Sequence, residues 1–400
     1  MKVLAIHRFY WPDTPPYASM LRAIVHQWVK DGHEVHVFSS QPSYKAGIQN
    51  IKQASREIVD GAEVIRLDLP SELGRPLVRV LNVIRLGLGV FWEAVFKKRY
   101  DVIMISTSPP VLGGWFAAVI ARLTGARFIY HCMDIHPEIG HISGEFRNPL
   151  IYGILSRLDR WTCEQANPVV VLSDDMADSL AKRKPEITLL THVLNNFSLP
   201  SETSALVQLP FVWPEESFVL LFAGNVGRFQ GLDFLIQAMG KLVDRRDIKL
   251  LIMGEGAEKD RLHELTKKTG ANVTFVGHQS VEVAKASMAR ANIGFVSLVP
   301  NLYRYAYPSK TITYLEQGCP VLVAIEQNAC LARDVVESGA GQVVDIGDVD
   351  MLCETILKLS DNPKLINGMK KNAISFSDKN FNRKSILATW SSLLDNKSVL

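Results

Sequence analysis

Short apolar runs alternate with longer segments of mixed polarity over the first half of the chain. The runs are KVLAIHRFY, HEVHVFSS, AEVIRLDLP, DVIMISTS, ARFIYHCMDI and VVVLS, and helix-like segments such as residues 19–30 separate them. Strands that alternate with helices predict parallel βαβ units and a doubly wound sheet. Glycine or proline lies where a predicted helix should end before the next strand, at Gly32, Gly61, Gly125 and Pro168.

A second series of the same kind follows a segment rich in proline and serine, LPSETSALVQLPFVWPEES, at residues 199–217. Its apolar runs are SFVLLFAG, IKLLIMGEG, VTFVGH, ANIGFVSL, CPVLVAI and AGQVVDI, with predicted helices at 232–243 and 258–268. We therefore predict an α/β protein of two Rossmann-like, doubly wound domains that face a central cleft. The predicted parts are residues 1–200, residues 201–375, and a segment 376–400 whose helix, near 381–394, crosses back to the first domain.

Composition narrows the class of protein. A net charge of +3 over 400 residues is too small to predict general nucleic-acid binding. Five cysteines without CxxC spacing favour a reducing cytoplasm over a disulfide scaffold. The first residues, MKVLAIHRFYWPD, predict a strand and a turn rather than a signal peptide. No apolar run reaches the roughly 20 uncharged residues that span a bilayer.

One amphipathic segment, VRVLNVIRLGLGVFWEAVFKK at residues 78–98, has basic flanks. Six cations stand against the single acid Glu93: Arg75, Arg79, Arg85, Lys97, Lys98 and Arg99. Two interpretations are open. The segment is either a core helix with a basic end, or an interfacial helix that rests on anionic lipid.

The segment FAGNVGRFQGLDFL places three glycines within eight residues after an apolar run. Glycine lets backbone N–H groups approach a phosphate closely, and Arg228 adds a fixed charge. A tight turn explains the same pattern, and the spacing does not match the GxGxxG of nicotinamide-binding proteins. The glycines of MGEG and the GH of VTFVGH likewise follow apolar runs, and each alone is explained by a turn.

The segment YPSKTITYLEQGCPVLVA places Lys310 in the first turn of a predicted helix. A helix N-terminus carries partial positive charge, so a cation there is unfavourable unless an anion is expected nearby. The pattern therefore predicts an anion between Lys310 and free backbone N–H groups.

Taken in order, GNxGxxQG, MGEG, VTFxGH and YPSKTxTYLxxGxPVLV resemble the donor domain of retaining family-4 glycosyltransferases of the GT-B fold. The similarity is greatest to the branch that builds bacterial surface polysaccharides of the O-antigen, capsule and colanic acid type. It spans nearly the whole chain, because SPP (108–110), DIHPE (134–138), VLSDDM (171–176) and LNN (194–196) also match that branch.

The resemblance implies a hexosyl or N-acetylhexosaminyl donor linked to a nucleotide diphosphate, usually UDP. Arg228 and Lys310 would be catalytic, because they would stabilise the leaving diphosphate. Retention needs no protein nucleophile, and no metal or other cofactor is expected, since cations of the protein replace one. The implied donor-binding residues are Gly224, Asn225, Gly227, Gly254, Glu255, Gly277, Pro308, Ser309, Thr311, Thr313 and Glu316.

Two departures concern the donor. Many members carry two glutamates where this chain has Tyr305 and Thr313, and Glu316 lies nearly one turn beyond Thr313, on a neighbouring face. Many also carry Arg and Lys where this chain has Asn225 and Gln230. Recognition of the ribose is therefore left open.

The acceptor is expected on the first domain. FYWPDTPPYASM, which contains Asp13 and Tyr17, follows the first strand and lacks the glycine pair of related enzymes. It either shapes an acceptor pocket or is a rigid turn. The DIHPE segment would supply Asp134 as a catalytic or acceptor contact, with His136 and Glu138 as further acceptor contacts. Its histidines lack zinc-ligand spacing, so a metal site is disfavoured.

The sequence thus favours a cytoplasmic glycosyltransferase, peripheral on the inner face of the plasma membrane. It would act on a nucleotide sugar and a polyprenyl-diphosphate-linked saccharide, with an anionic membrane surface as a partner. Two rivals keep the fold: a binding or scaffold protein that has lost turnover, and a UDP-sugar epimerase. Assays with labelled UDP- and GDP-sugars distinguish the enzyme from the scaffold, because only the enzyme hydrolyses or transfers the sugar. An epimerase would not need a helix that binds lipid.

Overall fold

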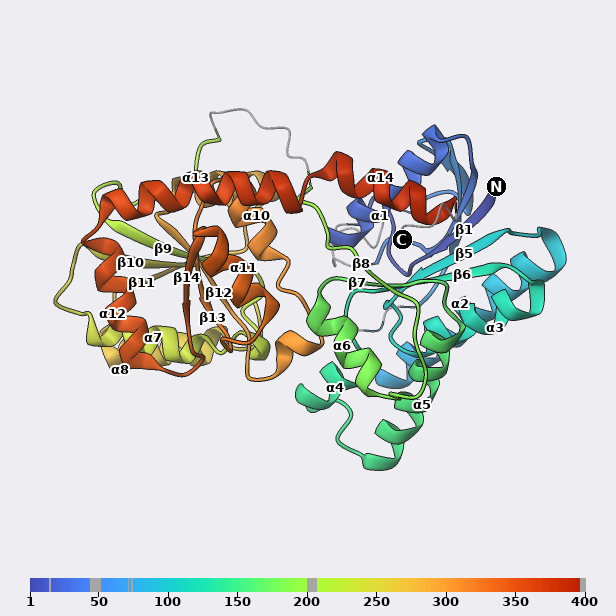
Figure 1. Cartoon of the computed structure of the whole chain (residues 1–400), viewed down its shortest axis with the longest axis horizontal. Helices are drawn as coiled ribbons and strands as arrows, with labels where there is room; N and C mark the ends of the chain where they lie inside the picture. The colour runs from blue at the N-terminus through green and yellow to red at the C-terminus, as the bar shows by residue number, and fades with distance from the viewer. Residues whose placement is uncertain (14–15, 44–51, 71, 73–74, 200–206, 396–400) are drawn as a thin grey trace. The chain divides into compact units, whose positions relative to one another are not determined.

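The computed structural model describes residues 1–13, 16–43, 52–70, 72, 75–199 and 207–395 (Figure 1). The chain forms two compact units. The first comprises Met1–Asn195 with Arg383–Leu400, and the second comprises Asn196–Asn382. The sequence placed these boundaries at 200/201 and 375/376. Each unit has its own mostly parallel sheet with interleaved helices, so the predicted α/β architecture is confirmed.

The first unit is built on an eight-stranded sheet in the order β3-β4-β2-β1-β5-β6-β7-β8. The central strands are buried on both faces, which is why they read as continuous apolar runs. Strand order reverses between β1 and β5, so the loops after these strands diverge at the carboxyl edge. The strands are β1 (Lys2–Ile6), β2 (Glu34–Ser40), β3 (Arg56–Val59), β4 (Ala62–Leu67), β5 (Val102–Ser106), β6 (Arg127–Cys132), β7 (Val169–Val171) and β8 (Thr191–Val193).

One glycine prediction in this unit is wrong. Gly61 does not end a helix, because β3 and β4 form an antiparallel hairpin in which Val59 pairs with Ala62. The two turn residues, Asp60 and Gly61, have φ of 51° and 87°, as a type I′ turn requires. Arg22 of the first helix donates to the Asp60 carboxylate at 2.6 Å and ties the hairpin to the sheet's helical layer.

The helices of the first unit are α1 (Pro16–Lys30), α2 (Pro76–Trp92), α3 (Leu112–Thr124), α4 (Glu138–Ile142), α5 (Pro149–Gln165), α6 (Asp174–Lys182) and α14 (Arg383–Leu394), and α2 continues into a π-helix, η1 (Glu93–Lys97). α14 lies beside α1. The Trp28 indole donates to the Trp390 carbonyl at 3.3 Å, and the two rings meet edge to face. The last helix of the chain is therefore a packed part of the first unit.

The second unit is built on a six-stranded parallel sheet in the order β11-β10-β9-β12-β13-β14. The strands are β9 (Phe218–Ala223), β10 (Ile248–Met253), β11 (Val273–Gly277), β12 (Ile293–Ser297), β13 (Val321–Ala324) and β14 (Gly341–Val344). Strand order reverses between β9 and β12, and such a switch point is where open α/β sheets bind ligands. The segments that follow these two strands are the glycine-rich turn and the approach to Lys310.

Seven helices flank this sheet within the described residues: α7 (Leu232–Lys241), α8 (Lys259–Thr269), α9 (Val281–Arg290), α10 (Lys310–Glu316), α11 (Cys330–Ser338), α12 (Val349–Ser360) and α13 (Pro363–Asn380). Two short 3-10 turns, η2 (Arg228–Gln230) and η3 (Leu302–Arg304), lie in the loops after β9 and β12. Across the described parts of both units, no helix has the length and hydropathy needed to cross a membrane.

Candidate functional site

The glycine-rich turn after β9 is locked against the end of β10. Gly224 has φ +150°, and its N–H donates to the Met253 carbonyl at 2.9 Å. A Cβ on Gly254 would stand 1.8 Å from the Gly224 carbonyl oxygen, so this position has room only for glycine. Gly256 is equally confined, since its Cβ would stand 2.1 Å from the Val226 carbonyl. The glycines of MGEG therefore support the turn by close backbone approach.

Lys310 opens α10 directly beside this turn. Its ammonium lies 3.8 Å from the centroid of the Phe222 ring, and a Cβ on Gly224 would stand 3.5 Å from Nζ. The Lys310 ammonium donates to the Gln230 side-chain carbonyl at 2.5 Å. Burial lowers the pKa of Lys310 to about 7. The half-buried cation thus has a neutral amide as its one polar partner among the described residues, and an anion placed there would stabilise its charged form.

A buried tyrosine fixes the place of this lysine. Tyr314 lies one turn after Lys310 on the same helix, and its hydroxyl donates to the Leu221 carbonyl at 2.8 Å and accepts from the Ala223 N–H at 2.7 Å. Both partners belong to β9. α10 is therefore fastened to the strand whose end carries Gly224, and Tyr314 was not among the residues predicted for the site.

The helix start contributes less than the sequence suggested. α10 has only seven residues, so its dipole is short. The Thr311 N–H already donates to the Pro308 carbonyl at 3.0 Å, and the Thr311 side chain is buried. Of the amides near this start, those of Ser309 and Lys310 have no acceptor within the described part of the chain. Lys310 and the Gly224 turn are therefore the main candidates for an anion-binding site.

Arg228 lies on the same loop but is mostly exposed, with 72% of its side chain accessible. Its nearest carboxylate is Glu258, at 3.4 Å. Asn225 is also exposed, and Gly227 is half-buried between them. Arg228 can reorient toward a ligand without breaking a buried contact, whereas Lys310 is already held in place.

The remaining residues predicted to bind the donor are partly engaged in other contacts. Glu255 is exposed and pairs with Lys259 at 2.8 Å, a hydrogen bond that lowers the pKa of Glu255. Glu316 accepts from the Ser198 hydroxyl at 2.5 Å and from the buried Lys285 ammonium at 2.9 Å. These contacts give Glu316 a structural role at the C-terminal end of α10. The carbonyl of Gly277, a residue with φ +70°, accepts from the Gly254 N–H at 2.8 Å, and the half-buried Thr313 side chain has no hydrogen bond among the described residues.

In the first unit, Tyr17 belongs to a buried polar cluster at the carboxyl ends of β1, β5 and β6. Its hydroxyl lies 2.8 Å from Nδ1 of His131, and Nδ1 of His7 lies 2.5 Å from the Ser106 hydroxyl. Burial lowers the pKa of both histidines to about 3, so both are neutral at pH 7. Asp13 is buried as well and accepts from the Ser43 N–H at 3.2 Å. Tyr17 and Asp13 are therefore buried residues that support the carboxyl edge of this sheet through hydrogen bonds.

The DIHPE segment is held by Arg183, which was not among the residues predicted for the site. The Arg183 guanidinium donates to Glu138 at 2.9 Å, to the His136 carbonyl at 2.8 Å and to the buried Asp159 at 2.6 Å. Tyr130 donates to the other oxygen of Asp159 at 3.0 Å. Glu138 is therefore already bound within the unit, where its ion pair with Arg183 anchors the segment, and its contact with an acceptor stays a prediction.

Asp134 and His136 remain as the chemical groups of that segment. Burial raises the pKa of Asp134 to about 6. Burial also lowers the pKa of His136 to about 4, and its buried Nδ1 has no hydrogen-bond partner within the described residues. A carboxylate with a raised pKa and a neutral imidazole suit contacts with hydroxyl groups.

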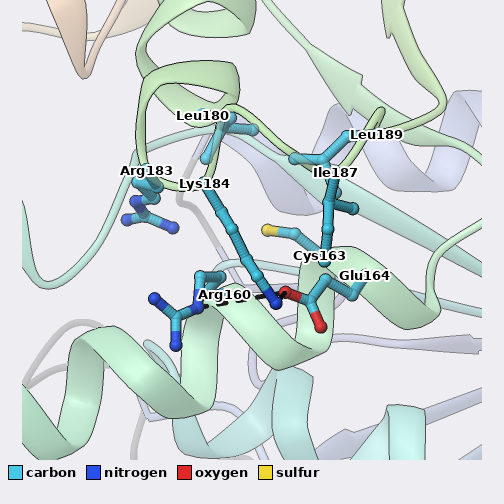
Figure 2. A pocket seen from close by; sticks show the side chains of 8 residues that line it. All are labelled: Arg160, Cys163, Glu164, Leu180, Arg183, Lys184, Ile187 and Leu189. Atoms are coloured by element: carbon cyan, nitrogen blue, oxygen red, sulfur yellow. Dashed lines mark ion pairs between the residues drawn. The ribbon is translucent and has the colours of Figure 1, made fainter.

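A small pocket lies between α5 and α6 and contains none of the predicted site residues (Figure 2). Arg160 and Lys184 both reach toward Glu164, at 3.9 and 3.6 Å, and the wall also contains Cys163, Leu180, Arg183, Ile187 and Leu189. Because its ion pairs are long and the rest of its lining is largely apolar, we interpret this pocket as a gap in the packing. Across the described residues, no group of three His, Cys, Asp or Glu side chains could hold a metal ion.

Comparisons with known proteins match both units. Residues 210–376 match the family model "Glycosyl transferases group 1", and residues 17–193 match "Glycosyl transferase 4-like domain". The chain is 25% identical over 273 residues to the probable glycosyltransferase WbjE of Pseudomonas aeruginosa, covering 64% of this chain and 67% of that protein. It is 23% identical over 354 residues to WcaI of Escherichia coli K12, a putative colanic acid biosynthesis glycosyl transferase, covering 82% and 84%.

Solved structures share the fold. Sucrose-phosphate synthase from Thermosynechococcus elongatus superposes with a TM-score of 0.78 at 16% identity, covering 99% of both chains. HepE of Anabaena in complex with UDP superposes with a TM-score of 0.70 at 16% identity, covering 99% of this chain and all of that one.

Proposed function

The chain belongs to the family-4 glycosyltransferases of the GT-B fold, and we propose that it transfers a sugar from a UDP-sugar to a lipid-linked saccharide with retention of the anomeric configuration. The observation that carries this proposal is the position of Lys310 against Gly224 and Phe222. The UDP complex of a structural neighbour supports the donor, and the similarity to WcaI, a putative colanic acid biosynthesis glycosyl transferase, supports the pathway class.

The proposed reaction breaks the bond between the anomeric carbon and the diphosphate oxygen and forms one to the acceptor hydroxyl oxygen. The acceptor proton passes to the leaving diphosphate on the same face, so no protein nucleophile is needed. Lys310 and the free amides of Ser309 and Lys310 would hold the charge that develops on the diphosphate. Arg228 would turn inward to add a second cation.

The proposed reaction uses no divalent metal, because the cations of Lys310 and Arg228 would neutralise the diphosphate in place of one. Asp134 and His136 are proposed as the acceptor contacts on the first unit. Glu138 and Asp13 would act indirectly, by holding the segments that carry those contacts.

A nucleotide-sugar panel tests the function. We expect a UDP-sugar to raise the melting temperature of the chain, and the same labelled sugar to appear on polyprenyl-diphosphate saccharides in the presence of chelator. Binding without transfer to any such acceptor would indicate a scaffold. Interconversion of the free UDP-sugar into an epimer would indicate an epimerase, and either result rejects the proposal.

We further propose that the chain works on the inner face of the plasma membrane, where such acceptors lie. Arg75, Arg79, Arg85 and Arg99 are exposed, and none forms an ion pair within the described residues. Replacing Arg79 and Arg85 together with glutamate should weaken binding to anionic vesicles at least about 30-fold, on a scale of about 1 kcal/mol per lost cation. Co-sedimentation measures this, with Arg245→Glu on the second unit as the control, and unchanged binding would reject the membrane assignment.

A further inference from the structure

The first half of α5 is apolar yet exposed. The side chains that α5 buries are Asp159, Thr162 and Cys163, all in its second half. At its start Leu150 is 78%, Ile151 50% and Ile154 56% exposed, on one face of the first two turns. The Asn148 side chain caps this end by accepting from the N–H groups of Leu150 and Ile151, so the turn is formed without any partner.

The outer face of α2 and η1 is likewise apolar and exposed. Its apolar side chains recur every three or four residues and are exposed: Leu77, Val80, Leu81, Ile84, Leu88, Trp92, Val95 and Phe96. Leu77 is 79% and Phe96 63% exposed, and the stripe is about 28 Å long. The opposite face, with Val83, Leu86 and Val90, is buried. These helices thus carry an apolar face on each side, and only the inner one is covered by the described chain.

The two exposed surfaces belong to one helical layer. α2 packs against α3, and α3 packs against α5 (Figure 1). Burial is the main cause of the low pKa of His136, just before α4, but Arg79 is close enough to contribute its charge. The helix that follows a parallel strand begins at the carboxyl edge of the sheet, so α2 and α5 both begin on the side that carries Asp134.

We propose that the stripe of α2 and η1 and the first two turns of α5 form one docking surface for an anionic lipid bilayer, with α5 as a second point of insertion. The proposal rests on the proposed function, which places the acceptor in a membrane. Two points of contact would fix the tilt of the first unit and bring the carboxyl edge of its sheet toward the lipid headgroups.

Charge selects the bilayer as the occupant. From residue 75 to residue 99 the one acid is Glu93, which is buried and paired with Arg56 at 2.6 Å and Lys97 at 3.4 Å. The solvent side of the stripe therefore presents only positive charge, which a second copy of the same face would repel. Apolar residues flanked by arginine, with Trp92 and Phe96 at one end, suit an interfacial helix.

The test uses the full chain and vesicles of phosphatidylglycerol and phosphatidylethanolamine. Leu150→Glu with Ile154→Glu should weaken binding about tenfold or more, because two inserted apolar side chains become charged. The matched control is Val212→Glu with Val243→Glu, which alters two exposed valines of the second unit and should bind like the wild type. Binding by the α5 variant that equals that of the control would overturn the proposal.

A label at Ile151 gives a readout that is independent of affinity. All five native cysteines are buried, so Ile151→Cys can be labelled selectively with an environment-sensitive dye. Its emission should shift to the blue on anionic vesicles and not on phosphatidylcholine, while a label at Val212→Cys should not respond. No shift at residue 151, or a shift caused by self-association without lipid, would overturn the α5 assignment. The rise in melting temperature with UDP, measured on the same samples, tests the donor proposal separately.

Discussion

Replacing Lys310 with methionine is expected to lower kcat at least about tenfold, and up to about 1,000-fold, while leaving the fold intact. The range is that of removing one preorganised charge-stabilising donor from an active site. Methionine keeps the length of the side chain over Phe222 and removes only the cation. Since burial disfavours the charged lysine, the variant should melt at the same temperature as the wild type or higher.

Initial rates with a saturating donor measure this effect. Lys241→Met is the matched control, because Lys241 is an exposed cation at the end of α7 that pairs with Asp350. The control should retain its rate within about twofold. Arg228→Ala should cost less than Lys310→Met, since the exposed arginine is not preorganised. A kcat of Lys310→Met equal to that of the wild type would refute the assignment of Lys310 to the leaving diphosphate.

The same lysine predicts a pH dependence of donor affinity. Burial lowers the pKa of Lys310 to about 7 in the free protein, and a bound diphosphate should raise it. Above pH 7, binding must therefore take up a proton, and affinity should fall by up to about tenfold per pH unit. Calorimetry in buffers of different ionisation enthalpy measures the uptake, which Lys310→Met should abolish.

The stability of the free protein should show the opposite trend. The pKa of Lys310 is lower in the folded chain than its ordinary value of 10.5, so the unfolded chain binds the extra proton between pH 7 and 10.5. The contribution of this group to the free energy of unfolding therefore rises with pH across that window. Urea unfolding of the wild type and Lys310→Met at pH 7 and pH 9 measures the difference.

Replacing Arg183 with methionine is expected to lower the free energy of unfolding by about 3–5 kcal/mol. The change leaves two carboxylates, Glu138 and the fully buried Asp159, without their cation, and an unpaired buried charge is costly. Equilibrium unfolding in urea measures the loss. Arg160→Met, which removes only a 3.9 Å surface pair with Glu164, should change the unfolding free energy by less than about 1 kcal/mol. Equal stability of the two variants would show that the Arg183 network does not hold the fold.

The sequence predicted the two sheets because most of the buried parallel strands are short apolar runs, several of them next to glycine or proline. It failed at Gly61, where an Asp-Gly pair closes an antiparallel hairpin. A glycine ends a helix and forms a hairpin turn by the same positive φ, and only the strand pairing distinguishes the two cases. The short helix at Lys310 was predicted, but its length was not.

The candidate site was predictable where backbone geometry demands glycine, as at Gly224 and Gly254. It was not predictable where a side chain finds a partner far along the chain. Gln230 binds Lys310 across 80 positions, and Arg183 binds Glu138 across 45. Tyr314 had one available signal, its place one turn after Lys310, but a buried tyrosine hydroxyl reveals its partners only in the folded unit. The assigned roles of Asp134 and Lys310 in turnover stay predictions.

A crystal structure of the chain with bound UDP tests the central claim most directly. The pyrophosphate should lie against the Gly224 turn, with one of its oxygens about 3 Å from the Lys310 ammonium in place of the Gln230 contact. A pyrophosphate bound away from the β9–α10 edge, or one bound while Lys310 still donates to Gln230 alone, would contradict the account.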